Sequence, residues 1–140
     1  MITTGVDLVK ISRMEKSLSV SGFAERYFGK NELEELHLRG DKVRNYAAAF
    51  AAKEAFGKAL GTGIRGFSLC EVELLHRDSG APYLRLSGNA ARIAEEKLKE
   101  YSVSITHEGE YACAVVVGIE APRNRAKNYD RADRESCCGR

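Results

Sequence analysis

Two lysines and a glutamate interrupt an alanine-rich segment at residues 50–64, "FAAKEAFGKALGTGI", which ends in a glycine-rich loop. In a helix, which turns 100° per residue, Glu54 and Lys58 share one narrow stripe with Ala47 and Ala51. The small alanines leave space beside the two charged groups. This stripe could bind a metal ion and an anionic substrate. On a solvated face, the same two residues would form only an i,i+4 ion pair.

A second carboxylate, Asp7, lies in the N-terminal segment "ITTGVDLV", whose alternating pattern predicts a strand. Magnesium takes one or two protein carboxylates and completes its shell with water and substrate phosphate oxygens. Asp7 and Glu54 are therefore candidate magnesium ligands, provided that the fold brings them together. The alternative is a carboxylate at a strand end that simply faces water.

Three further features suit a phosphate-bearing ligand. Lys58 supplies a positive point charge, and Gly61, Thr62 and Gly63 form a loop whose backbone N–H groups can surround phosphate oxygens. His107 ends a predicted strand and could be another phosphate partner. Each feature also has a structural explanation, since glycine commonly terminates helices and a lone histidine usually packs without binding a ligand.

The elements that would position these residues indicate an α+β fold, with an antiparallel sheet packed on one long and several shorter helices. Asn31 and Asp41 are the expected N-caps of a short helix and of the long helix. The last strand is almost continuously apolar and should lie centrally in the sheet. In chain order we predict a strand at 2–9, short helices between 11 and 38, a long helix ending at 60, a hairpin of strands at 70–77 and 83–87, a helix at 88–100, and strands at 101–107 and 111–119.

The composition fits one domain at residues 1–121, because 140 residues with 44% hydrophobic content can build a single core. Residues 122–140 have little to bury and are predicted to be a basic, disordered tail. A net charge of +2 argues against a protein that coats nucleic acid, and the lack of a signal peptide or a long apolar run predicts a cytoplasmic protein without a membrane anchor. The four cysteines, Cys70, Cys113, Cys137 and Cys138, have neither zinc-site nor disulfide-framework spacing.

Three segments, "GVDLVKISRM", "FAAKEAFGKALGTGI" and "VSITHEGEYACAVVV", closely resemble the holo-[acyl-carrier-protein] synthase family of phosphopantetheinyl transferases over residues 2–120. The resemblance implies the fold of that family and transfer of 4'-phosphopantetheine from coenzyme A to a serine of apo acyl carrier protein, with release of adenosine 3',5'-bisphosphate. It also implies a magnesium-dependent homotrimer with active sites between neighbouring subunits. Such an enzyme serves lipid biosynthesis, and either fatty acid or polyketide synthesis could be its main client.

The same resemblance assigns roles to individual residues. Asp7 and Glu54 match the metal-binding acids, and Glu54 is the favoured base for the serine proton. Lys58 matches the lysine that faces the pyrophosphate. His107 and the Gly61–Gly63 loop match coenzyme A contacts.

Arg13 and Arg26 lie where the first helices of the family meet the acidic carrier protein. One position departs from the family pattern, because Ala49 stands where the family often carries an arginine that holds nucleotide phosphates. Lys42, Arg44 or Lys53 could compensate, and the sequence leaves that choice open.

Two other classes of function compete with this prediction. A non-catalytic nucleotide-binding module would use the Gly61–Gly63 loop and would not need Asp7. A small nucleic-acid binder would use the basic helices and the tail. The near-neutral charge and the lack of aromatics interleaved with basic residues count against this second alternative.

Overall fold

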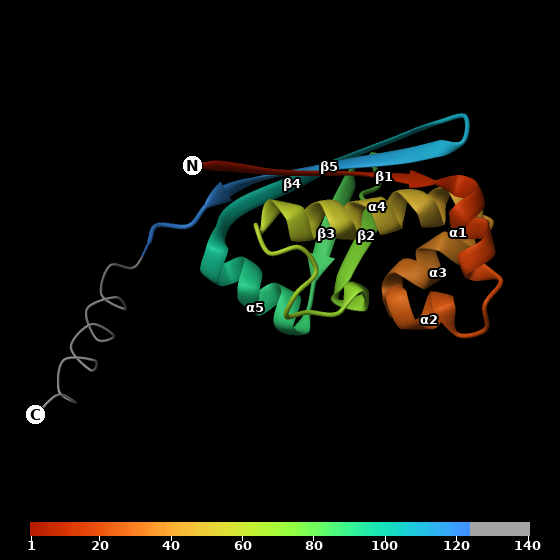
Figure 1. Cartoon of the computed structure of the whole chain (residues 1–140), viewed down its shortest axis with the longest axis horizontal. Coiled ribbons are helices and arrows are strands. Elements are labelled where there is room, and N and C mark those ends of the chain that lie inside the picture. The colour runs from red at the N-terminus through yellow and green to blue at the C-terminus, as the bar shows by residue number, and fades with distance from the viewer. Residues whose placement is uncertain (124–140) are drawn as a thin grey trace, which may run out of the picture.

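The computed structural model describes residues 1–123, which form an α+β fold as predicted (Figure 1). The elements are β1 Ile2–Lys10, α1 Ile11–Leu18, α2 Phe23–Tyr27, α3 Lys30–Leu38, α4 Val43–Ala59, a 3-10 turn Leu69–Glu71, β2 Val72–His76, β3 Pro82–Leu86, α5 Gly88–Lys97, β4 Leu98–Glu108 and β5 Tyr111–Glu120. Apart from residues 122 and 123, the predicted tail, with Cys137 and Cys138, lies outside the described residues. Within residues 1–123, no helix is long and apolar enough to cross a bilayer.

The main sheet has three antiparallel strands in the order β1-β5-β4, so the apolar strand β5 is central, as predicted. Helix α4 lies along one face of this sheet (Figure 1). Asp7 pairs with Ala114, which in turn pairs with Ile105, and the three side chains point toward α4. The strand alternation thus directs the candidate metal acid of β1 to the helix side of the sheet.

A glycine in β1 allows the strand to approach α4 closely. A Cβ atom on Gly5 would overlap the carbonyl oxygen of Ala55 and lie only 2.7 Å from the amide nitrogen of Ala59. Helix α4 has small side chains in this region. Its alanines between 47 and 55 are nearly all without exposed surface. Close backbone packing places Asp7, two residues beyond Gly5, beside the last two turns of α4.

The substitution Gly5→Ala should therefore separate β1 from α4 and destabilise the protein by about 1–3 kcal/mol, the usual cost of overpacking a core. Urea unfolding measures this loss. Gly118→Ala is the matched control, because its Cβ would meet side-chain atoms of Thr3 and Leu98, which can move, and it should cost less. Equal unfolding midpoints for Gly5→Ala and the native chain would show that the close approach has no structural importance.

The remaining strands form the predicted hairpin, in which β2 pairs antiparallel with β3. The helix predicted to reach residue 100 was too long, because α5 ends at Lys97 and β4 begins at Leu98. Leu98 is buried and pairs with Glu120 at the end of β5. Sheet pairing and burial thus outcompete the local helical pattern over these last residues.

Both predicted N-caps were wrong. The N-cap of α3 is Gly29, and Asn31 instead donates its amide to Glu73 Oε1 over 3.1 Å. The N-cap of α4 is Lys42. Asp41 accepts a 2.7 Å hydrogen bond from the Tyr46 hydroxyl, and burial together with this bond raises the pKa of Tyr46 to about 12.

Candidate active site

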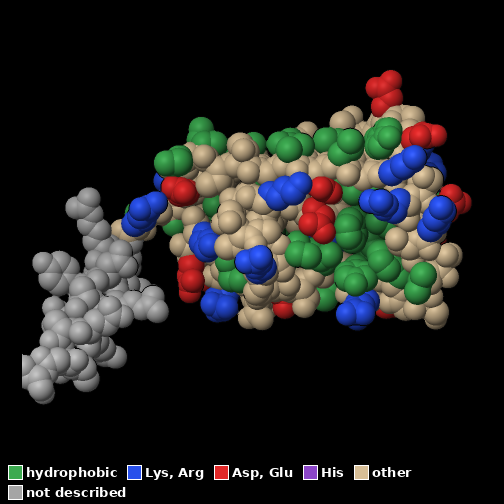
Figure 2. Space-filling model, in the orientation of Figure 1, with side chains coloured by type: hydrophobic (Ala, Val, Ile, Leu, Met, Phe, Trp, Pro, Cys, Tyr) green, Lys and Arg blue, Asp and Glu red, His purple; other side chains and the backbone are tan. Residues whose placement is uncertain are grey.

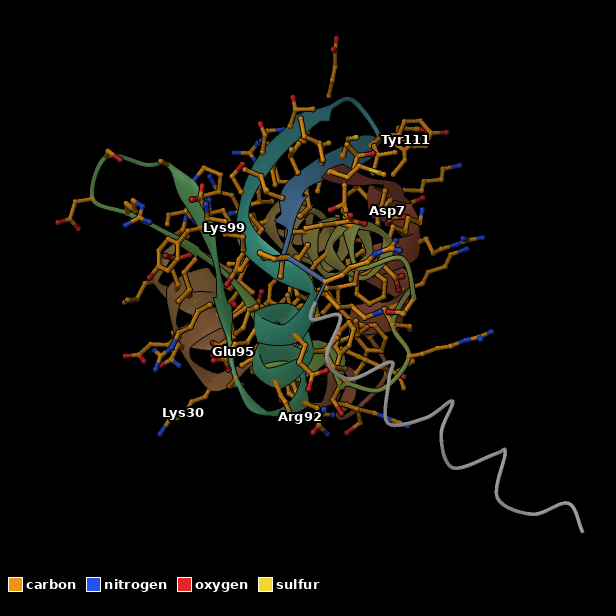
Figure 3. The ribbon with its side chains drawn as sticks, turned by 90° about the vertical axis from the view of Figure 1, so that its left-hand side faces the viewer. Asp7, Lys30, Arg92, Glu95, Lys99 and Tyr111 are labelled. Atoms are coloured by element: carbon orange, nitrogen blue, oxygen red, sulfur yellow. The ribbon has the colours of Figure 1, made fainter. Side chains whose placement is uncertain are left out.

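Lys58 contacts β1 and does not pair with Glu54. Its Nζ donates to the Val6 carbonyl oxygen over 2.9 Å and lies 3.3 Å from Asp7 Oδ1. No Lys58–Glu54 ion pair exists among residues 1–123, so the i,i+4 alternative is contradicted. Asp7 lies where β1 passes α4 (Figure 3), and the Lys58 side chain is 52% exposed, which leaves its ammonium accessible to a ligand.

Glu54 is half-buried one helical turn before Lys58 and shares a groove with Asp7. Burial raises the pKa of the Glu54 carboxyl, the nearby charge of Asp7 raises it further, and Lys58 lowers it. Because both residues line the same groove, the two carboxylates share one environment. A cation between them would relieve both their repulsion and their partial desolvation.

The donor set fits a hard cation such as magnesium, which prefers carboxylate oxygen and keeps coordination positions for substrate phosphates. The described part of the chain, residues 1–123, contains no cluster of three or more histidine, cysteine, aspartate or glutamate side chains suited to a metal. Asp7 and Glu54 alone would therefore need oxygen ligands from water or substrate, which is the coordination that magnesium commonly has in phosphate-transfer sites.

The groove beside these acids has a volume of about 310 Å³ and runs toward α1 and α2. Its lining combines both acids with the basic residues Lys10 and Arg13 and with apolar side chains that include Phe23 and Phe50. In Figure 2, acidic and basic side chains lie next to a hydrophobic surface in the region of β1 and α4. The groove can thus accept a ligand that has both a charged and an apolar part.

The other predicted ligand contacts do not join this cluster within one chain. His107 is exposed, lies on the α4 side of the sheet and is separated from β1 by β5. The Gly61–Gly63 loop follows the C-terminal end of α4, whereas the turn between β4 and β5, which comes directly after His107 and Glu108, lies toward the opposite end of that helix (Figure 1). Among residues 1–123, no hydrogen bond joins His107 to Asp7, Glu54 or Lys58.

One candidate replacement for the family arginine is excluded. Ala49 is buried and offers no cation, and Lys53 is also buried, with no exposed surface. Lys53 donates to Glu32 and to backbone carbonyl oxygens, so it cannot reach a phosphate in solvent. Lys42 and Arg44 are exposed at the N-terminal end of α4, and they remain the two candidates.

Comparison with known proteins decides the family. A family model described as the 4'-phosphopantetheinyl transferase superfamily matches residues 3–116. The chain belongs to this superfamily. A transferase of Fusobacterium nucleatum, named holo-[acyl-carrier-protein] synthase, is 40% identical over 119 residues, which cover 84% of this chain and 98% of that protein.

Solved structures of phosphopantetheinyl transferases have the same fold. Holo-[acyl-carrier-protein] synthase from Neisseria meningitidis superposes with a TM-score of 0.79 at 34% identity, covering 85% of this chain and 99% of that chain. The Helicobacter pylori synthase in complex with coenzyme A gives a TM-score of 0.73 at 33% identity, covering 85% and 100%. The resemblance read from the three sequence segments is thereby confirmed.

Sequence analysis missed two buried acids, of which Glu32 pairs with Lys53 and Glu73 accepts from the Glu32 amide. Glu32 and Glu73 lie beneath the surface of this phosphopantetheinyl transferase fold, at 0% and 6% exposure. Glu32 stands in "NELEELHL", where glutamates recur in a pattern typical of a solvated helix face. Only the long-range packing of α3 against β2 shows that one of these glutamates, Glu32, is internal.

Proposed function

We propose that this chain transfers 4'-phosphopantetheine from coenzyme A to a serine hydroxyl of apo acyl carrier protein and releases adenosine 3',5'-bisphosphate. The observation that carries the proposal is the pair of acids Asp7 and Glu54 at an accessible groove between β1 and α4, with the ammonium of Lys58 3.3 Å from Asp7 Oδ1. Membership of the transferase superfamily and the coenzyme A complex of a relative support the same reaction. A cytoplasmic location remains a prediction.

The activity is proposed to depend on magnesium held by Asp7 and Glu54. Bound there, the ion would draw negative charge from the phosphate oxygens, which otherwise repel a nucleophile. The two negative carboxylates repel each other in the shared groove, and a cation bound between them would relieve that repulsion. Manganese has the same preference for oxygen, so the donor set accepts either ion.

Lys58 and Glu54 are proposed to act directly in the transfer step. Lys58, freed from Asp7, stabilises the charge that develops on the departing bisphosphate. Glu54 takes the serine proton as the serine oxygen forms its bond to phosphorus and the bond to the bisphosphate breaks. In the metal-free chain burial and Asp7 raise the pKa of Glu54, and a bound cation would lower it again, so the base role rests on the position of Glu54 in the groove.

Release of adenosine 3',5'-bisphosphate tests this function. Chromatography should detect the product only when coenzyme A, magnesium and apo carrier protein are all present. A non-catalytic nucleotide-binding module would bind coenzyme A without releasing product, and its affinity would not change in Asp7→Asn. That pair of results would overturn the proposed function in favour of binding alone.

We infer that the enzyme is a homotrimer, because the second face of the main sheet carries apolar side chains without cover. Ile2, Val6 and Leu8 are 69%, 56% and 61% exposed, and Val117 and Ile119 of β5 extend the same face. Among residues 1–123, no helix packs there (Figure 1). Exposed apolar surfaces of this kind usually mark protein contacts.

A shared site would also unite the separated ligand contacts, with His107 of one subunit near the Gly61–Gly63 loop of its neighbour. Light scattering at micromolar concentration should report a trimer. Val6→Glu should shift the protein toward monomer and reduce turnover together, because a charge would be buried in the interface. A native chain that is monomeric and fully active would contradict the shared site.

Arg13 and Arg26 are proposed to attract the acidic carrier protein. Arg13 lines the groove next to the acids, and Arg26 is exposed on α2, where it stacks on Tyr27. Charge reversal at either arginine should raise the KM for carrier protein and flatten its salt dependence, while coenzyme A binding stays nearly constant.

Steady-state kinetics at several salt concentrations measures both effects. Arg85→Glu, on β3, is the control of equal charge change, and it should leave the KM for carrier protein unchanged. If coenzyme A affinity falls as much as carrier affinity in Arg13→Glu or Arg26→Glu, these arginines belong to the coenzyme A site.

A further inference from the structure

A buried ion pair lies directly behind the candidate site. Lys53 and Glu32 have no exposed side-chain surface, and Lys53 Nζ donates to the Glu32 carboxylate and to the carbonyl oxygens of Val72 and, over 3.2 Å, Leu69. These contacts use all three ammonium hydrogens. Burial raises the pKa of Glu32 and lowers that of Lys53, and the contact between them opposes both shifts.

Glu32 and a second acid connect this pair to two further elements. Glu32 accepts hydrogen bonds from the amides of Leu74 over 2.7 Å and Gly29 over 3.2 Å. Glu73 in turn accepts from the Glu32 amide over 2.7 Å. Helices α3 and α4 and strand β2 are thus joined around one ammonium group.

The position of this network along α4 matters because Lys53 immediately precedes Glu54. Consecutive residues of a helix point about 100° apart. Lys53 therefore holds the side of α4 that faces α3 and β2, while Glu54 faces β1 and the groove. Any rotation of α4 that breaks the Lys53 contacts would also move the Glu54 carboxylate relative to Asp7.

The side chains of α4 around Lys53 are mostly small, although the buried ring of Phe56 and the close approach of Gly5 to Ala55 also hold this helix. Six alanines between 47 and 55 pack with almost no exposed surface, and alanine side chains form shallow ridges. Buried polar contacts can fix a register that apolar packing leaves loose. A rotation of only about 20° would move a carboxylate about 6 Å from the helix axis by roughly 2 Å, given the dimensions of an α-helix.

We propose that Lys53 is a positioning residue for the transfer reaction: its buried contacts with Glu32, Leu69 and Val72 fix the rotation of α4, so that Glu54 meets Asp7 at the metal site. This role rests on the proposed function. It also assigns a purpose to the lysine of "AAKEA" that neither phosphate binding nor a surface ion pair explains.

The test compares Lys53→Met with Leu84→Ala, a control that removes buried apolar volume from β3 opposite Leu74 but leaves every hydrogen-bonding group of the network in place. Both are destabilising substitutions, so both are assayed at a temperature where circular dichroism shows each variant fully folded. Binding of Mn²⁺ in the presence of coenzyme A is measured by electron paramagnetic resonance, alongside kcat and KM. Lys53→Met should bind Mn²⁺ about tenfold more weakly and lose about tenfold or more in kcat, with the KM for coenzyme A unchanged, whereas Leu84→Ala should retain native values.

Native Mn²⁺ affinity and kcat in folded Lys53→Met would overturn the positioning role. If Lys53→Met does not fold, Glu73→Gln, at the edge of the network, decides the question. A weaker effect in the same direction supports the proposal, and a folded Glu73→Gln with native values overturns it. Absence of Mn²⁺ binding by the unaltered chain would instead refute the metal site itself.

Discussion

Replacing Lys58 with methionine is expected to lower turnover about 100-fold or more while leaving the melting temperature almost unchanged. A cation that meets the departing bisphosphate acts mainly in the transition state, because charge accumulates there as the bond to phosphorus breaks. The ground-state contacts of Lys58 are an exposed ion pair to Asp7 and one hydrogen bond to Val6, and exposed pairs contribute little to stability.

A surface pair elsewhere provides the matched control. Arg92 and Glu96 on α5 form an i,i+4 ion pair of 3.7 Å with both side chains 61% exposed. Arg92→Met should leave both turnover and melting temperature near their native values. If Lys58→Met lowers the melting temperature and leaves turnover intact, Lys58 serves the structure and has no catalytic role.

The second large effect is expected at the two acids. Asp7→Asn and Glu54→Gln should each remove about 2–4 kcal/mol of transition-state stabilisation, by analogy with the loss of one electrostatic stabiliser. Each substitution keeps the shape of the side chain and removes the charge that would hold the metal. Assays across a wide magnesium range separate weaker binding from slower chemistry. Near-native turnover of both variants at saturating magnesium would contradict the assignment.

Glu54→Gln should also change stability, with a sign that follows from its raised pKa. A carboxyl whose pKa is higher in the folded chain favours folding below its unfolded pKa, and this contribution is lost as the pH rises through the folded pKa. At neutral pH, the ionised Glu54 therefore disfavours folding when no metal is present. Without magnesium, the glutamine variant should melt at a higher temperature than the native chain, and a lower melting temperature would contradict this sign.

Periodicity predicted the parts of the site that depend on local structure. Alternation in β1 placed Asp7 on one face, and helical spacing placed Glu54 and Lys58 on one stripe, because both patterns are set by neighbouring residues. The central position of β5 followed from its apolar composition. The approach of β1 to α4 could not be predicted in this way, since it depends on the contact of Gly5 with Ala55, fifty residues away.

The environment of Lys53 was beyond sequence analysis for the same reason. Its partners lie on α3 and β2, and nothing in the spacing of Lys53 and Glu32 shows that both charges are internal. The end of α5 shows a related limit, because pairing of Leu98 with Glu120 outcompetes a helical pattern. Long-range contacts thus determine which charged residues are buried and where a helix or strand ends.

The most direct test of the transferase account is mass spectrometry of an apo acyl carrier protein incubated with this protein, coenzyme A and magnesium. The native chain should add the mass of one phosphopantetheine to the carrier. The addition should disappear when the carrier serine is replaced by alanine, and it should be much slower with Glu54→Gln. The folding of the native chain is verified first, and magnesium and coenzyme A are supplied in excess. An unchanged carrier mass under these conditions would contradict the account.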